Sequence, residues 1–269
     1  MATQAQVGLS GENTGGLTAF IDRWIYVFMA SLLFVTVLVG FVPDSLMKIE
    51  MVRAGQRPPF PAILHVHAVT MGLWLLLLLT QTTLMATGRR GIHMQLGVAG
   101  MILMPAIVLT GVILVPTIYD QIYSQFRSAP SEVAREMAPF VDYIGNVALL
   151  QFSAAIAFPV LVILALRARR KHPDLHKRLM ILATTIPMPA AIDRMTWLPH
   201  SFPEGAMSVS LYPQLLIAPM FLWDLYRLRR IHAAYLIYLA VFLPLAVIKE
   251  ILWGSDWWLA MVPGLLGQG

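Results

Sequence analysis

The sequence predicts an all-α protein, a bundle of about seven transmembrane helices. Its 269 residues are 58% hydrophobic and only 12% charged, whereas a soluble domain carries about 25% charged residues. The charges are clustered, which leaves uncharged runs of about 20 residues, the length that crosses a bilayer. The chain has no cysteine, so disulfides, thiolate metal sites, iron–sulfur clusters and covalently attached haem are excluded. Any metal or haem would be held by His, Met, carboxylate or Tyr side chains.

The apolar runs predict where each span begins and ends. Residues 1–22 lack the basic and apolar regions of a signal peptide, and we expect a flexible tail there. A single domain over residues 23–258 would hold spans at 24–43, 62–87, 95–118, 141–166, 179–198, 209–226 and 233–253, followed by a short C-terminal tail at 259–269. Pro187 and Pro189 predict a distortion of the fifth span.

The distribution of charge predicts the orientation of the bundle. The N-terminal tail and every second loop hold 12 Lys or Arg and 4 Asp or Glu. The remaining segments hold 7 Lys or Arg and 10 Asp or Glu. Cytoplasmic loops are the ones enriched in Lys and Arg, so we expect the N-terminus inside and the C-terminus outside. Because the basic residues border apolar spans, the expected partner is the lipid bilayer and not nucleic acid. Trp253, Trp257 and Trp258 would lie at the outer interface.

Polar side chains gather toward the outer ends of four predicted spans. Ionisable groups inside a membrane are costly and usually face the bundle interior or a cavity, so their convergence predicts a binding site. The residues are His65, His67, Trp74 and Gln81 in the second span, Asp142 and Asn146 in the fourth, Asp193, Arg194 and His200 after the fifth, and Lys249 and Glu250 in the seventh. Each one also has a purely structural alternative; Lys249 and Glu250, for example, would extend to the interface.

The candidate ligands form three sets. Haem b needs two axial nitrogens from facing helices, and the pairs would be His93 with His176 at the inner end or His67 with His200 at the outer end, with Arg194 or Lys249 holding a carboxylate. The alternatives are a divalent metal ion on His65, His67, Asp142 and Asp193, or a polar substrate near Trp74, Gln81, Asn146, Lys249 and Glu250. The inner histidines could equally be solvated in their basic turns.

Two stretches, "LHVHAVTMGLWLLLLLTQTTLMATGRRGIHMQLG" and "HPDLHKRLMILATT", resemble a group of uncharacterised bacterial multi-pass membrane proteins. The shared pattern is a His-bearing helix, a Gly-Arg-Arg turn and a later basic His motif, at His67, Arg89, His93, Gly97, His176, Arg178 and Met180. More distantly, the chain resembles the YozB/CtaM-like maturation factors of haem–copper oxidases and the four-helix b-type membrane cytochromes. Diheme cytochromes place paired His inside their helices, whereas the inner candidates here lie in basic turns. These resemblances imply a bacterial inner membrane and haem.

We therefore expect a redox or cofactor-handling membrane protein that binds haem b or a metal ion. One alternative is a transporter or lipid-active enzyme that holds a small polar molecule or a headgroup at the same cluster. Another is a structural subunit of a larger membrane complex, in which the polar groups pair among themselves. No residue is assigned to catalysis.

Overall fold

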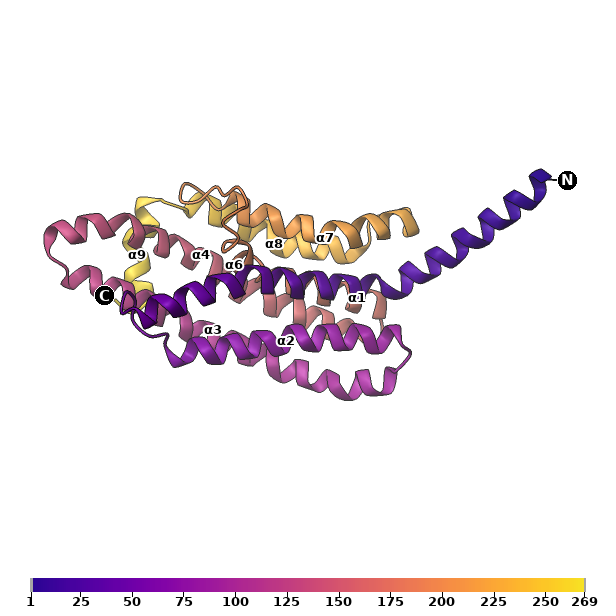
Figure 1. Ribbon diagram of the computed structural model, residues 1–269, viewed down its shortest axis with the longest axis horizontal. Coiled ribbons are helices and arrows are strands. Elements are labelled where there is room, and N and C mark those ends of the chain that lie inside the picture. Colours follow the sequence, from indigo (N-terminus) through magenta and orange to yellow (C-terminus); the bar gives the residue numbers. More distant parts are fainter. Residues whose placement is uncertain (1, 269) are drawn as a thin grey trace.

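The computed structural model describes residues 2–268, with side chains from residue 15 onward. Its regular structure over those residues is α-helix without any β-strand, which confirms the all-α prediction. The elements are α1 (Ala2–Arg53), α2 (Ala62–Ala86), α3 (Arg90–Ser128), α4 (Ser131–Ala168), α5 (Pro173–Thr185), α6 (Pro189–Ile192), α7 (Met207–Leu228), α8 (Ala233–Leu252) and α9 (Asp256–Leu265) (Figure 1).

Five helices are long and apolar enough to cross a bilayer: residues 15–53 of α1, then α2, α3, α4 and α8. Large apolar side chains point out of the bundle; Val69, Ile102 and Ile251 are 61%, 66% and 70% exposed. Such exposure of apolar surface suits lipid and not water. The chain is thus a multi-pass membrane protein.

The α3–α4 hairpin extends beyond the predicted spans. α3 has 39 residues and α4 has 38, which at 1.5 Å per residue is roughly 57 Å each. The hydrocarbon core is about 30 Å thick, so part of both helices lies outside it. Figure 1 shows their connection projecting at one end of the molecule.

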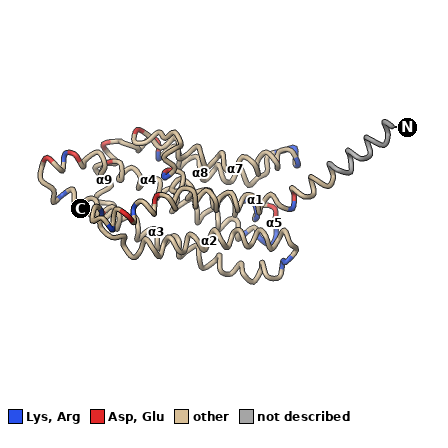
Figure 2. The backbone as a smooth tube through the Cα atoms, in the orientation of Figure 1, with Lys and Arg blue, Asp and Glu red and all other residues tan. Residues whose placement is uncertain are grey.

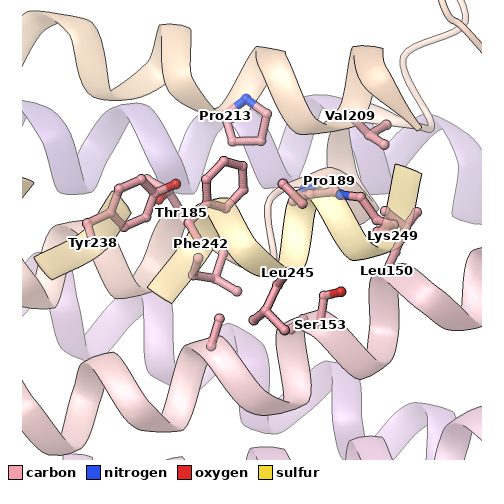
Figure 3. Close-up of a pocket in the computed structure, with 14 residues that line it drawn as sticks. Leu150, Ser153, Thr185, Pro189, Val209, Pro213, Tyr238, Phe242, Leu245 and Lys249 are labelled. Atoms are coloured by element: carbon pink, nitrogen blue, oxygen red, sulfur yellow. The ribbon is translucent and has the colours of Figure 1, made fainter. Parts of the chain in front are cut away.

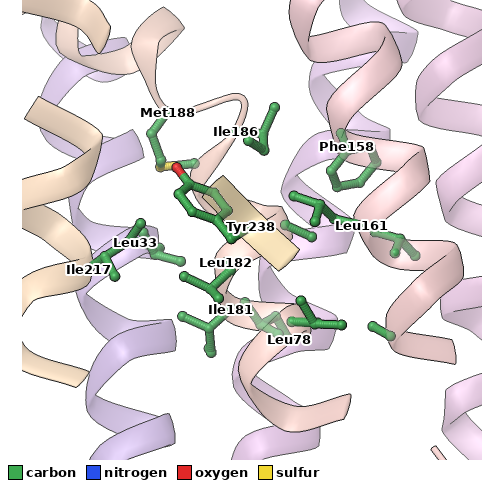
Figure 4. Packing of buried hydrophobic residues seen from close by; sticks show 14 of the residues in the cluster. Leu33, Leu78, Phe158, Leu161, Ile181, Leu182, Ile186, Met188, Ile217 and Tyr238 are labelled. Atoms are coloured by element: carbon green, nitrogen blue, oxygen red, sulfur yellow. The ribbon is translucent and has the colours of Figure 1, made fainter. Parts of the chain in front are cut away.

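The core lies where α4, α5 and α8 meet α1 and α2. Met29, Leu33, Trp74, Leu161 and Leu182 are at most 1% exposed. They belong to one cluster of buried apolar side chains, part of which is drawn in Figure 4. This packing holds the helices that carry the polar groups described below.

The fifth predicted span breaks at its prolines, as expected. α5 ends at Thr185, and the four-residue α6 starts at Pro189. By contrast, Pro105 lies inside α3 and Pro244 inside α8 without ending either helix. At the break, α6 approaches α1 so closely that a methyl group on Gly40 would collide with the backbone carbonyl of Ala191.

Both predicted tails differ from the structure. The N-terminal part, residues 1–14, lies outside the described side chains, but residues 15–22 are helical and continue into α1. They are held because Asp22 accepts hydrogen bonds from Trp223 and Arg227 of α7. Residues 259–265 belong to α9, whose Val262 is only 1% exposed. The predicted domain limit at 258 therefore falls inside a packed helix.

The tryptophans near the C-terminus are not all interfacial. Trp253 and Trp258 are buried, and only Trp257 is largely exposed. Trp258 donates its indole N–H to the Gly145 carbonyl at 3.0 Å, because α9 folds back against α4. Of the three, Trp257 alone is largely exposed, as an interfacial tryptophan would be.

The two ends of the molecule differ in the charge that they carry (Figure 2). Lys and Arg gather where α2, α4 and α7 end and where α3, α5 and α8 begin; we call this the basic end. Acidic and basic residues are mixed at the other end, near α9; we call this the mixed-charge end.

Candidate functional site

An ion-pair network joins α1 to the turn after α6 at the mixed-charge end. Asp44 lies 2.7 Å from the Lys48 ammonium and 3.2 Å from Arg194 Nε. The Arg194 guanidinium also donates to the Ala190 carbonyl and lies 4.3 Å from the centre of the Phe41 ring. These contacts fix the proline break of the fifth span against α1.

Asp193 precedes Arg194 in the sequence and also lies near His200. Asp193 Oδ1 accepts a hydrogen bond of 3.4 Å from the Tyr143 hydroxyl. The Asp193 carboxylate also interacts electrostatically with Arg194 and His200. The structure thus brings together three predicted site residues, and the protein supplies partners for the Asp193 and Arg194 side chains.

The His200 ring is part of an aromatic stack. It lies 6.0 Å from the Phe202 ring and nearly parallel to it, and Phe202 stacks in turn on Trp253 at 5.3 Å. His200 Nε2 lies 3.2 Å from the Met195 carbonyl. Its Nδ1 is buried with no hydrogen-bond partner in the described part of the chain.

Lys249 is buried instead of extending to the interface, being 4% exposed. It lines a cavity of about 30 Å³, and Ser153, Thr185 and Tyr238 line other parts of the same cavity (Figure 3). That volume suits one water molecule. Among the residues with described side chains, none forms an ion pair or hydrogen bond with its ammonium. The neighbouring Glu250 is exposed, so the two residues occupy different environments.

The other predicted metal ligands lie apart from this cluster. His67 Nδ1 is 3.0 Å from Thr110 Oγ1 of α3, while His65 and Asp142 are exposed on α2 and α4. No three His, Asp or Glu side chains in the described range are grouped so that they could hold a metal ion. The predicted metal ligands His65, His67, Asp142 and Asp193 are therefore not grouped together. The predicted outer haem ligands, His67 and His200, contact different elements.

Two residues predicted to bind substrate hold helices together. Trp74 lies in the core and donates its indole N–H to Thr184 Oγ1 at 3.1 Å. Asn146 Oδ1 accepts the Gly254 backbone N–H at 2.9 Å, next to the start of α9. Both side chains therefore stabilise tertiary contacts.

At the basic end, the histidines that open α3 and α5 lie near each other. Gln81 Nε2 donates to the His93 carbonyl at 3.1 Å, whereas Gln81 Oε1 and His93 Nδ1 are buried without a partner among the described atoms. His176 Nδ1 lies 2.9 Å from the Ala165 carbonyl, to which it can only donate. The two imidazoles interact electrostatically. A carbonyl on one ring nitrogen leaves the other as a metal ligand, the usual arrangement of metal-bound histidine.

A buried charged network at the same end was not predicted. Arg178 of α5 donates to Asp224 of α7 at 2.7 and 2.5 Å. Tyr235 of α8 donates its hydroxyl to Asp224 at 2.6 Å, and the Arg178 side chain also donates to the Asp174 carbonyl. The available signal was Asp224 itself, an acidic residue inside the predicted sixth span.

No family model, no curated protein and no solved structure matches this chain. The arguments below therefore depend on the geometry of the chain alone.

Proposed function

We propose that this chain is a seven-span redox protein of a bacterial cytoplasmic membrane, with haem b bound at its basic end. The observation that carries the proposal is that His93 and His176, which open two different helices at this end, interact electrostatically and each have a ring nitrogen available for a ligand.

The five long apolar helices support five spans. Two further spans are proposed, α7 and the broken pair α5–α6, and for α7 the support is that its polar side chains face other helices. α7 has 22 residues, about 33 Å at 1.5 Å per residue. Its Gln214 donates to the Tyr238 hydroxyl and its Asp224 pairs with Arg178, so these polar groups are turned away from lipid. α5 with α6 would form the remaining, broken span. Positively charged loops favour the cytoplasmic side, which puts the basic end there.

The donor set fits haem b better than other metal groups. Two imidazoles from different helices are the usual axial ligands of a b-type haem. His176 is fixed by the Ala165 carbonyl, as bound histidines usually are. His93 carries a buried ring nitrogen for which the described residues supply no partner, a costly arrangement unless a ligand or water satisfies it.

Haem b in this position would supply reversible one-electron transfer. The protein's own residues would hold and orient the axial histidines. Ala165 fixes the His176 ring, and Gln81 is tied to the backbone of His93. Burial of this region by α4 would limit access of water.

The test is the absorption spectrum of purified protein expressed with an adequate haem supply, oxidised and reduced with dithionite. We expect a b-type difference spectrum that is lost in His93→Ala and in His176→Ala. His172→Ala is the matched control, because His172 precedes α5 but is exposed and makes no side-chain cap. A colourless wild-type protein, or a spectrum unaffected by both variants, would overturn the proposal. Elemental analysis of the same sample tests for another metal.

Lys249 favours a second candidate, the transport or processing of a small polar substrate or lipid headgroup at the mixed-charge end. Its side chain is buried beside a cavity and forms no ion pair or hydrogen bond with a described residue, and Glu250 attracts its charge without forming an ion pair. The cavity of about 30 Å³ would have to widen to admit a substrate, whose acceptor oxygen would then satisfy the ammonium. Stabilisation of cofactor-free protein by such a substrate, lost in Lys249→Met, would support this candidate over the redox one.

A further inference from the structure

A hollow opens between α3 and α4 at the basic end. Its volume is about 420 Å³, and it is lined by apolar and cationic side chains: Met101 of α3, with Ile163, Leu166, Arg167, Arg169 and Arg170 in or just after α4. The apolar residues lie along the helices, and the arginines lie where α4 ends at Ala168. The lining therefore changes from apolar to cationic along the membrane normal.

The arginines of this hollow have no anionic partner. None of Arg167, Arg169 and Arg170 forms an ion pair with a carboxylate of residues 15–268. The one acidic residue in the segment 167–178 is Asp174, which pairs with Lys177 at 2.8 Å and also approaches Arg178. Three positive charges consequently face the hollow uncompensated.

The apolar part of the hollow is exposed to lipid. Ile163 and Met101 are 44% and 38% exposed. Arg169 reaches across from α4 and places Nη1 3.5 Å from the Met101 sulfur, so the cationic and apolar parts adjoin. The preference of Lys and Arg for cytoplasmic loops and the dipole at the end of α4 explain why arginines occur here. Neither effect requires a hollow with an apolar side.

We propose that this hollow binds an anionic phospholipid. The phosphate diester would lie among Arg167, Arg169 and Arg170, and an acyl chain would lie along Met101 and Ile163. Arginine binds phosphate oxygens in a bidentate manner, and basic pockets between transmembrane helices on the cytoplasmic side bind anionic headgroups. Free phosphate would bind the arginines in the same way, but it has no acyl chain to contact Met101 and Ile163. The inference depends on the chain being in a membrane and not on haem.

The experiment uses full-length protein in detergent. Binding is measured by native mass spectrometry and by the thermal unfolding midpoint, with phosphatidylglycerol or phosphatidylcholine of identical acyl chains. We expect phosphatidylglycerol to remain bound and to raise the midpoint more than phosphatidylcholine. The double variant Arg169→Gln/Arg170→Gln should bind phosphatidylglycerol about 25-fold more weakly, from about fivefold per arginine.

The matched control is Arg89→Gln/Arg90→Gln, which removes two exposed charges from a neighbouring turn at the same end and should leave the preference intact. Met101→Glu is a second variant; it places a carboxylate beside Arg169 and should abolish the preference without removing any arginine. Equal binding of the two lipids, or equal losses in both arginine double variants, would overturn the proposal. Displacement of the lipid by millimolar inorganic phosphate would show a phosphate site instead. Because the readout is lipid binding, its failure is separate from the failure of the haem spectrum.

Discussion

Arg178 and Asp224 form a bidentate ion pair between α5 and α7, with N–O distances of 2.7 and 2.5 Å. The two residues are only 6% and 4% exposed, and the Tyr235 hydroxyl completes the coordination of the carboxylate. One pair thus joins three helices at the basic end, where the chain otherwise carries mainly repelling positive charges.

We expect Asp224→Asn to lower the free energy of unfolding by about 3–5 kcal/mol, because removing one partner leaves a buried guanidinium without its counter-ion. Thermal unfolding in detergent measures the change. The matched control is Asp22→Asn. It breaks the pair between Asp22 of α1 and Arg227, which lies on α7 as Asp224 does. That pair is more than 40% exposed on both sides, so the loss should be much smaller than for Asp224→Asn. Equal losses would show that burial does not determine the strength of the pair.

We expect Gly40→Ala to destabilise the protein by about 1–3 kcal/mol or more, since the added methyl group collides with the Ala191 backbone and must separate α1 from α6. Gly72→Ala, in the middle of α2, is the control. No described atom outside that helix's own backbone lies within 4 Å of the added methyl group, so this variant should gain about 0.5–1 kcal/mol of helix stability. A neutral Gly40→Ala would contradict the close approach of α1 and α6. Unfolding midpoints of the two variants provide the comparison.

We expect Lys249→Met to raise the free energy of unfolding by at most about 1–3 kcal/mol, the cost of a buried polar group that no protein group satisfies, reduced by whatever hydrogen bond a water in the cavity supplies. Methionine is unbranched and only one atom shorter than lysine, and it removes the charge. Chemical denaturation in mixed micelles measures the change. A loss of stability would show that the ammonium is satisfied by a ligand or water, and would strengthen the second functional candidate.

The stability of the start of α8 should depend on pH through His232. Its Nδ1 accepts the Ala234 backbone N–H at 3.1 Å, which only the neutral ring can do. Burial, and secondarily Arg178, lowers the pKa of His232 in the folded protein. The unfolded chain therefore binds more protons, so this stability is complete above the ordinary pKa of about 6.5. It is lost as the pH falls below that value toward the folded pKa.

Hydrogen exchange at the first turn of α8, measured between about pH 5 and 8, tests this dependence against His232→Asn. Asparagine also caps a helix but does not titrate, so its protection should change less with pH after correction for the intrinsic exchange rate. A pH profile identical in both proteins would exclude His232 as the titrating group.

Much of the fold was predictable because it depends on local sequence. Apolar runs predicted every long helix, and Pro187 with Pro189 predicted the break that separates α5 from α6. The limits were predicted less well. α3 and α4 continue past the apolar runs, because a helix can extend into water or headgroups, so a fall in hydropathy marks the end of the apolar run and not the end of the helix.

The candidate site was predictable only in part. Asp193, Arg194 and His200 are near in sequence, and Asp193 interacts electrostatically with both of the others. His67 and Asp142 were grouped with them by depth, but depth along a helix does not specify which neighbour a side chain faces. His67 instead contacts Thr110. Trp74 shares its helix face with polar residues, yet it packs in the core.

The sequence by itself determined the class of this protein, its helical spans and the division between a basic and a mixed-charge end, because hydropathy, proline and net charge are local properties of the chain. Tertiary structure alone decided that Arg178 meets Asp224, that Lys249 is buried, that His93 lies near His176, and that a hollow opens beside three arginines. Each of these depends on the rotation and contact of helices far apart in sequence. Such contacts are determined by side-chain packing over the whole bundle and not by any single segment.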